Sequence, residues 1–226
     1  MLLGCAILLA ACGGEPPDPR NELRVYNWSD YIAPDTIARF EAETGIRVIY
    51  DVFDSNEVLE AKLLSGAAGY DIVVPTSDFM GRQIVAGVFQ ALDKSKLTNY
   101  ANLDPELMAL ITRFDPDNRY GVPYLWGTTG IGYNVDAITE RLGEDAPVDS
   151  LDLVFVPEYL AQLADCGVAF LDAPSEIFAA VLHYLGEDPN STEPDVYKQD
   201  AQQLLQAIRP FVTYFHSSQY INDLAN

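Results

Sequence analysis

Three short apolar runs stand in the first third of the chain, and a helical pattern follows each of them. The runs cover residues 23–31, 46–52 and 71–74. Alternating or short continuous apolar runs are typical of strands, whereas apolar residues three and four apart are typical of helices. The helical patterns cover residues 34–44, 54–65 and 76–87, with prolines or polar caps at their starts and glycines at their ends. This order predicts an α/β fold with a parallel, doubly wound sheet.

Two details of this pattern make specific predictions. Asp54, followed three residues later by Glu57, matches a capping box for the second helix. The third run, residues 71–74, is continuously apolar after its first residue, which is expected of a parallel strand that is buried on both faces.

The second half of the chain predicts fewer strands. Strands are expected at residues 168–171 and 213–215, and a helix is expected at 194–208. Another helix begins after residue 172 and ends at Gly186, and its buried face consists of Ile177, Phe178, Val181, Leu182 and Leu185. A helix is also expected after the Asp104-Pro105 pair.

Residues 120–134 carry four aromatics and four glycines without a helical period. We interpret this segment as extended chain that crosses from a first lobe to a second one. An ordinary edge strand is the alternative. The expected organisation is a leader and tether at 1–22, a first α/β lobe at 23–126 and a second α/β lobe at 127–226.

Polar loops follow all three predicted strands of the first lobe, at residues 28–31, 54–55 and 76–78. Loops at the carboxyl ends of parallel strands meet at one edge of the sheet, where ligands bind. Trp28, Asp30 and Tyr31 together suit a cationic organic ligand, because a carboxylate supplies charge and the rings supply cation–π attraction. The alternative is that the two rings pack between lobes and Asp30 is a solvated loop residue. Likewise, the polar residues of the other two loops could simply cap helices.

Charge supports a cationic ligand and argues against polyanions. Asp and Glu number 34 against 13 Lys and Arg, which gives a net charge of −21. This balance argues against nucleic acid and anionic membrane surfaces as partners. An acidic surface can also serve solubility or a salty habitat. The loops lack the glycine-rich turn of a phosphate site.

Catalytic motifs of the common hydrolase, protease, nucleotide-binding and redox types are absent from the sequence. The two histidines, His183 and His216, are far apart in the sequence. An enzyme is therefore not expected, although a carboxylate pair of the glycosidase kind remains an alternative in so acidic a chain. Neither a cofactor nor a metal is expected.

The N-terminus resembles a bacterial lipoprotein signal. Residues 1–11 form an apolar run, and small residues precede Cys12. The run is too short to span a membrane. The pattern predicts export, acylation of Cys12, a proline-rich tether at 15–20 and a folded part attached to a membrane only through lipid. The basic region that such signals carry is missing, so the true start is expected upstream. Cys166 then remains as a thiol that is either buried or lacks its partner.

Four longer segments resemble one known family. They are residues 28–36, 50–57, 128–134 and 216–224. They are similar to the bacterial periplasmic polyamine-binding proteins, in particular the putrescine-binding branch of polyamine ABC importers. The resemblance implies a two-lobed periplasmic binding protein fold (type II) that closes on its ligand by hinge motion. It also implies a monomer that delivers putrescine or a related polyamine to the permease subunits of an ABC transporter.

The resemblance also implies roles for individual residues. Glu176 corresponds to a second-lobe carboxylate that receives an ammonium group, although its position in the first turn of a helix is also explained by the helix dipole. Asp78 stands where the family commonly has a neutral residue, and its charge could shift the preference between a diamine and a longer polyamine. The first-lobe residues implied in the pocket are Trp28, Ser29, Asp30, Tyr31 and Thr76.

Members of the family continue well past residue 226, so this sequence is expected to be a fragment with an incomplete second lobe and missing return segments. The resemblance implies that the disulfide partner of Cys166 lies in that further part. The alternative functions are a polyamine sensor without a transport role, a non-functional remnant, and a secreted carboxylate-dependent hydrolase.

Overall fold

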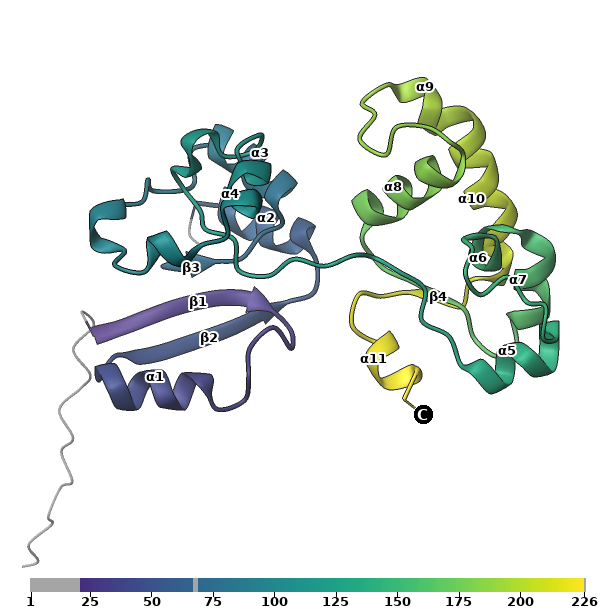
Figure 1. Cartoon of the computed structure of the whole chain (residues 1–226), viewed down its shortest axis with the longest axis horizontal. Helices are drawn as coiled ribbons and strands as arrows, with labels where there is room; N and C mark the ends of the chain where they lie inside the picture. Colours follow the sequence, from purple (N-terminus) through teal and green to yellow (C-terminus); the bar gives the residue numbers. More distant parts are fainter. Residues whose placement is uncertain (1–20, 67–68, 226) are drawn as a thin grey trace, which may run out of the picture.

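The computed structural model describes residues 21–66 and 69–225. These residues form two lobes that lie side by side and are joined by an extended segment (Figure 1). We use "first lobe" for the described residues up to 119, "crossing segment" for residues 120–134, and "second lobe" for residues 135–225. The predicted signal, the tether and Cys12 lie outside the described residues.

The first lobe is built on a parallel three-stranded sheet with the order β2-β1-β3. Its strands and the helices between them are β1 (Glu22–Trp28), α1 (Thr36–Thr44), β2 (Arg47–Phe53), α2 (Asn56–Leu64), β3 (Ile72–Val73) and α3 (Ser77–Val85). Strands β1 and β2 pair along their full length, from Glu22↔Arg47 to Trp28↔Phe53. The predicted β-α-β-α-β-α order and the α/β class are therefore confirmed.

The ends of the helices follow from local chemistry, with two corrections. Gly45 ends α1 in the left-handed conformation at φ 70°, where glycine pays no side-chain penalty. The capping box predicted at Asp54 is wrong, because Ser55 caps α2 and accepts a hydrogen bond from the Val58 N–H at 3.2 Å. Asp78 also does not cap α3. It lies in the first turn, and Thr76 occupies the cap position.

Strand β3 is less buried than predicted. Ile72 is 47% exposed, and only two residues of β3 pair with β1. The prediction of a strand buried on both faces is therefore wrong for the described part of the chain. The physical reason is that β3 lies at the edge of the described sheet, with β1 on one side only.

The remainder of the first lobe consists of short helical pieces. Helix α4 (Pro105–Ile111) begins as predicted, and the Asp104 carboxylate accepts from the N–H groups of Glu106 and Leu107 at 2.8 and 3.1 Å. The other pieces are the 3₁₀ turns η2 (Lys94–Lys96), η3 (Tyr100–Asn102) and η4 (Pro116–Asn118).

A buried carboxylate fixes the start of the crossing segment. Asp115 is fully buried, and it accepts hydrogen bonds from the backbone N–H groups of Arg119, Tyr120 and Gly121 at 2.9, 2.8 and 3.0 Å. Residues 121–134 then run without regular secondary structure into the second lobe (Figure 1). The extended conformation is as predicted. The boundary between residues 126 and 127 lies inside this segment and stays a prediction.

The second lobe is mostly helical. Its elements are α5 (Val135–Leu142), α6 (Asp152–Phe155), α7 (Pro157–Leu163), β4 (Ala169–Phe170), α8 (Pro174–Tyr184), α9 (Pro194–Val196), η5 (Tyr197–Ala201), α10 (Gln202–Ile208), η6 (Arg209–Phe211), β5 (Tyr214–Phe215) and α11 (Tyr220–Asp223). Strands β4 and β5 pair in parallel. The helix predicted at residues 194–208 is present, but a π-helical turn at η5 interrupts it.

Each lobe has its own hydrophobic cluster. In the first lobe, Tyr26, Phe53 and Leu59 form a buried cluster between the sheet and α2. In the second lobe, ten buried side chains from α5 to α10 form a larger one. Cys166 is free and exposed, so the alternative of a buried thiol is wrong, and the disulfide that the resemblance implies stays a prediction. In the described part of the chain, none of the helices combines the length and the apolar character needed to cross a membrane.

Candidate ligand-binding site

Aromatic rings gather where β1 and β2 end. Trp28 and Phe53 are the last residues of these strands and pair in register, with ring centroids 4.7 Å apart. The Trp28 indole N–H donates to the carbonyl of Val74, just past β3, at 2.8 Å. The indole is thus fixed by all three strands of the sheet. Its packing partners Phe53 and Val74 belong to the first lobe, whereas the alternative interpretation placed the ring between the lobes. The indole also stands at the carboxyl ends of the strands, where a ligand is expected.

The turn after β1 presents the next predicted site residues to solvent. Asp30 is exposed and adopts a left-handed conformation at φ 61°, which aspartate tolerates better than most residues. Tyr31 is 44% exposed, and its ring centroid lies 5.9 Å from that of Trp28. The hydroxyl of Tyr124 in the crossing segment donates to the Tyr31 carbonyl. The crossing segment therefore helps to hold this turn.

Ser29 contacts a carboxylate that also touches the second lobe. The Ser29 hydroxyl donates to Asp54 Oδ1 at 3.0 Å, and the Ser218 hydroxyl of the second lobe donates to the same oxygen at 2.7 Å. The hydrogen bond from Ser218 lowers the pKa of Asp54, and the hydrogen bond from Ser29 and the proximity of His216 act in the same direction against partial burial. Asp54 is therefore ionised at neutral pH and is a strong acceptor.

Thr76 lies at the start of α3, where two side chains order it. Its backbone N–H donates to Asn56 Oδ1 at 3.0 Å, and its hydroxyl donates to Asp78 Oδ1 at 2.6 Å. The carbonyl of Val74, two residues before Thr76, accepts the hydrogen bond from the Trp28 indole. Thr76 is therefore close to the site along the chain. Asp78 is exposed and adds a negative charge beside Thr76.

Glu176 stands apart from these residues, in the second lobe. It is exposed in the first turn of α8, and its Oε2 accepts a hydrogen bond from the Thr129 hydroxyl of the crossing segment at 2.7 Å. The structure thus brings Trp28, Ser29 and Tyr31 together at one edge of the first lobe. Among the described residues, the hydrogen bond of Glu176 goes to the crossing segment rather than to that edge.

Four residues connect these parts, and none of them was predicted as a site residue, although Asp54 lies in one of the three loops that the sequence places at this edge. Tyr124 and Thr129 lie in the crossing segment, while Asp54 and Ser218 join the lobes. The positions of Asp54 and Ser218 differ by 164 in the sequence, so no local pattern could have paired them. The described residues contain no group of three or more His, Cys, Asp or Glu side chains that could hold a metal ion.

Comparison with known proteins identifies the class to which this architecture belongs. The family model described as "Bacterial extracellular solute-binding protein" matches residues 35–225, so the chain belongs to that family. Over 219 residues the chain is 61% identical to the putrescine-binding periplasmic protein PotF of Escherichia coli (strain K12), a match that covers 97% of this chain and 59% of PotF. It is 59% identical to the putrescine-binding periplasmic protein SpuD of Pseudomonas aeruginosa (strain UCBPP-PA14), covering 90% of this chain and 55% of SpuD.

Solved structures agree with the sequence relatives. A putative spermidine/putrescine ABC transporter protein from Listeria monocytogenes superposes with a TM-score of 0.75 at 37% identity, covering 87% of this chain and 57% of that one. The Tp0655 (TpPotD) lipoprotein of Treponema pallidum gives a TM-score of 0.72 at 29% identity, covering 90% and 60%. The predicted periplasmic binding protein fold is confirmed. The chain spans less than two thirds of the length of these relatives.

Proposed function

We propose that this chain acts in the extracytoplasmic capture of putrescine or a related polyamine, for delivery to the permease subunits of an ABC transporter. The observation that carries the proposal is the distribution of exposed charge and aromatic surface. Asp30 stands beside Trp28 and Tyr31 on the first lobe, and Glu176 stands on the second. The similarity to PotF and SpuD supports polyamines as the ligand class.

The chemistry of a diamine fits these groups. Each end of putrescine is an ammonium that donates hydrogen bonds and prefers a carboxylate, and the chain between the ends is apolar. We assign Glu176 to one ammonium group and Asp30 to the other. The faces of Trp28 and Tyr31 are assigned to the methylene groups and to cation–π contact with an ammonium. Ser29 and Thr76 complete the proposed first-lobe set as hydroxyl residues.

Ligand length is selected by the separation of the charges that receive it. A site with two carboxylates on opposite lobes binds a diamine well only when the lobes bring those carboxylates to the spacing of its nitrogens. Asp78, beside Thr76, offers a further carboxylate at the first-lobe edge. We propose that it favours a longer polyamine with an additional ammonium, relative to a protein with a neutral residue there.

Delivery requires the protein to remain close to its permease. We propose that a lipid anchor at Cys12, followed by the tether at residues 15–20, attaches the folded part to a membrane on the periplasmic side. We propose a monomeric, non-enzymatic binding protein in the periplasm. PotF and SpuD are named as periplasmic proteins, which supports this location.

Isothermal titration calorimetry tests the proposal. The 226-residue chain and a chimera, in which it is joined to the part of PotF outside the match, are titrated with putrescine, cadaverine, spermidine and spermine. N-acetylputrescine, which keeps one ammonium and loses the other, is the matched control ligand. We expect saturable heat with at least one polyamine and much weaker binding of the control. Absence of heat with all four polyamines in both proteins would contradict the proposal.

A further inference from the structure

The Asp54 carboxylate links the two lobes. It lies in the loop after β2, and its Oδ1 accepts hydrogen bonds from the hydroxyls of Ser29 in the first lobe and Ser218 in the second. A carboxylate oxygen has two lone pairs, so one atom can accept both. The two distances, 3.0 and 2.7 Å, are those of ordinary hydrogen bonds.

Ser218 is held in place on the second-lobe side. The ring nitrogen Nδ1 of His216 accepts from the backbone N–H groups of Ser218 and Gln219, both at 3.0 Å. Helix α11 begins two residues after Ser218, and the Tyr214 hydroxyl of β5 bonds to the Asp223 carboxylate of that helix. The loop that carries Ser218 is thereby connected to the second-lobe sheet, so that a movement of the lobe moves the hydroxyl.

Asp54 is equally well fixed on the first-lobe side. It directly follows Phe53, whose ring is buried against Tyr26 and Trp28. The Ser29 N–H also donates to the Phe53 carbonyl at 3.4 Å. Asp54 and the loop of Ser29 thus rest on the same packed rings, and their relation to each other is set by the sheet.

We propose that Asp54 is a positioning residue that orients the Ser29 hydroxyl in the ligand-binding loop and couples this orientation to the arrangement of the two lobes. The proposal rests on the proposed function, because Ser29 matters for affinity only if its loop binds the ligand. When the lobes separate, the hydrogen bond from Ser218 to Asp54 breaks. Asp54, which accepts the hydrogen bond from the Ser29 hydroxyl, is then held by the first lobe alone. The hydrogen bonds therefore stabilise the described arrangement and increase polyamine affinity.

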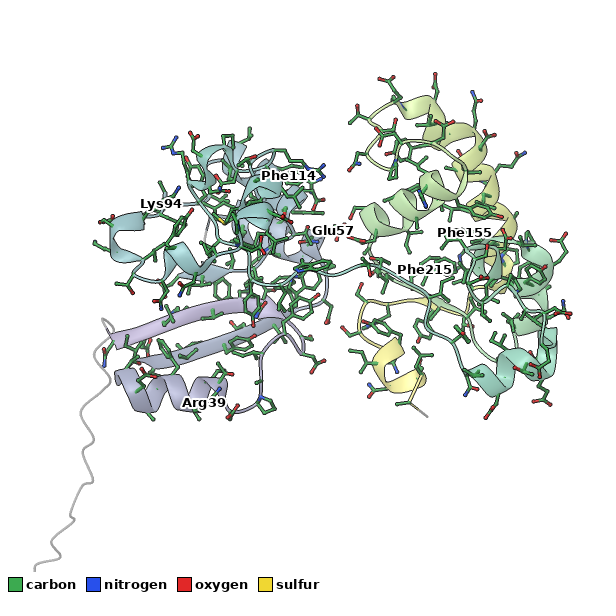
Figure 2. All side chains as sticks on the ribbon, viewed as in Figure 1. Arg39, Glu57, Lys94, Phe114, Phe155 and Phe215 are labelled. Carbon is green, nitrogen blue, oxygen red and sulfur yellow. The ribbon has the colours of Figure 1, made fainter. Side chains whose placement is uncertain are left out.

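General attraction of a cation by negative charge must be separated from positioning. Glu57 supplies the matched control, since it is an exposed carboxylate in the first turn of α2, three residues after Asp54. Figure 2 shows Glu57 on the side of the first lobe that faces the second lobe. Its substitution removes the same charge from the same region without removing a link between the lobes.

The experiment combines putrescine titration with small-angle X-ray scattering on the protein that binds in calorimetry. The variants are Asp54→Ala, Ser218→Ala, their double mutant, Asp54→Asn and Glu57→Ala. We expect Ser218→Ala and Asp54→Ala each to weaken putrescine binding by about 3- to 10-fold and to increase the radius of gyration. The double mutant should bind no more weakly than Asp54→Ala alone, because both changes remove the same link. Asp54→Asn keeps an acceptor oxygen, so it should lose less putrescine affinity than Asp54→Ala. Glu57→Ala should leave the affinity and the radius of gyration unchanged.

Two results would overturn the inference. One is a double mutant whose fold-loss of putrescine affinity equals the product of the fold-losses of the two single mutants. The other is equal weakening by Glu57→Ala and Asp54→Ala, which would assign the effect to charge alone. Ser218→Ala alters a second-lobe loop outside the buried core, so it remains informative if Asp54→Ala does not fold. If no polyamine binds to the unmodified protein, the proposed function fails, whereas the radius of gyration of Ser218→Ala still decides whether Asp54 joins the lobes.

Discussion

The first lobe and the second lobe are stabilised in different ways. The first lobe has two seven-residue strands paired along their length, but its buried cluster holds only Tyr26, Phe53 and Leu59. The second lobe has strands of two residues and a buried cluster of ten side chains, drawn mainly from helices. Backbone pairing therefore organises the first lobe, whereas burial of helix faces organises the second.

This difference extends to the proposed site. In the first lobe, Trp28 is at once a proposed ligand contact and a packing partner of Phe53, so its roles in binding and stability are not separable. In the second lobe, Glu176 is exposed and lies outside the buried cluster. Changes at Glu176 can therefore alter binding without altering folding. The comparison teaches that the two halves of one site can differ in how far they depend on the core.

The largest effect is expected from Phe155→Ala in the second lobe. Phe155 is 2% exposed and packs against Tyr184, with ring centroids 5.2 Å apart. Removing a buried phenyl ring costs about 3–5 kcal/mol of unfolding free energy. Urea unfolding followed by far-ultraviolet circular dichroism measures this loss.

The same experiment tests whether the lobes unfold separately. Both tryptophans of the chain, Trp28 and Trp126, lie outside the second lobe. If the lobes are independent, Phe155→Ala shifts the dichroism transition and leaves the tryptophan fluorescence transition in place. Equal shifts of both signals would show that the two lobes unfold as one cooperative unit, which would contradict the view that each lobe is stabilised separately. Val135→Ala, at a position in α5 that is 63% exposed, is the control and should change little.

Leu59→Ala is the counterpart in the first lobe. Leu59 is 0% exposed and packs in one buried cluster with Tyr26 and Phe53. Its truncation leaves a cavity in a small cluster and should cost about 2–5 kcal/mol. Here tryptophan fluorescence should report the full loss of stability. The adjacent Val58→Ala, at an exposed position, should stay within about 0.5 kcal/mol of the unmodified protein, as is usual for surface changes.

Sequence patterns predicted the first lobe better than the second. The strand and helix periods up to Gly45 and the caps at Asp104 and Gly186 are local signals, and the structure contains the elements that they predicted. Helices α5 to α7 were not predicted. Helix α5 has a polar cap at Asn134 and a glycine at its end, which are local signals that could have found it, whereas α6 has four residues and α7 has seven and begins at a proline. Neither has enough turns for a clear period. The π turn in the helix from residue 194 likewise has no periodic signature.

From the sequence, only the part of the candidate site formed by loops after the parallel strands could be predicted. Loops after parallel strands meet at one edge, and the hydrogen bonds from Ser29 to Asp54 and from Thr76 to Asn56 join the three predicted loops there. Contacts between lobes depend on how the chain returns after the crossing segment. No local rule pairs Asp54 with Ser218, or Thr129 with Glu176 at a separation of 47 residues. Such pairs follow from the tertiary arrangement alone.

Glu176→Gln tests the assignment of the second-lobe carboxylate. The change removes the charge and keeps the shape, so putrescine binding should weaken by about 1.5–3 kcal/mol, the scale of a charge-assisted hydrogen bond. Calorimetry measures the affinity, and thermal unfolding without ligand should be unchanged, since Glu176 is exposed. Asp172→Asn, an exposed carboxylate just before α8, controls for the loss of one charge. An affinity equal to that of the unmodified protein would refute the role of Glu176.

The smallest effect is expected from Thr129→Val, which tests how the crossing segment contributes to the second-lobe half of the site. Valine keeps the branched shape of threonine but cannot donate to Glu176 Oε2, so the carboxylate loses a partner that fixes its orientation. The loss in putrescine affinity should be about 0.5–1.5 kcal/mol. Thr129→Ser retains the hydroxyl and should bind as the unmodified protein does, and Thr128→Val is the neighbouring control. In the presence of Glu176→Gln the effect of Thr129→Val should shrink, because the oriented charge is already absent. An undiminished effect there would mean that Thr129 acts through the backbone of the crossing segment rather than through Glu176.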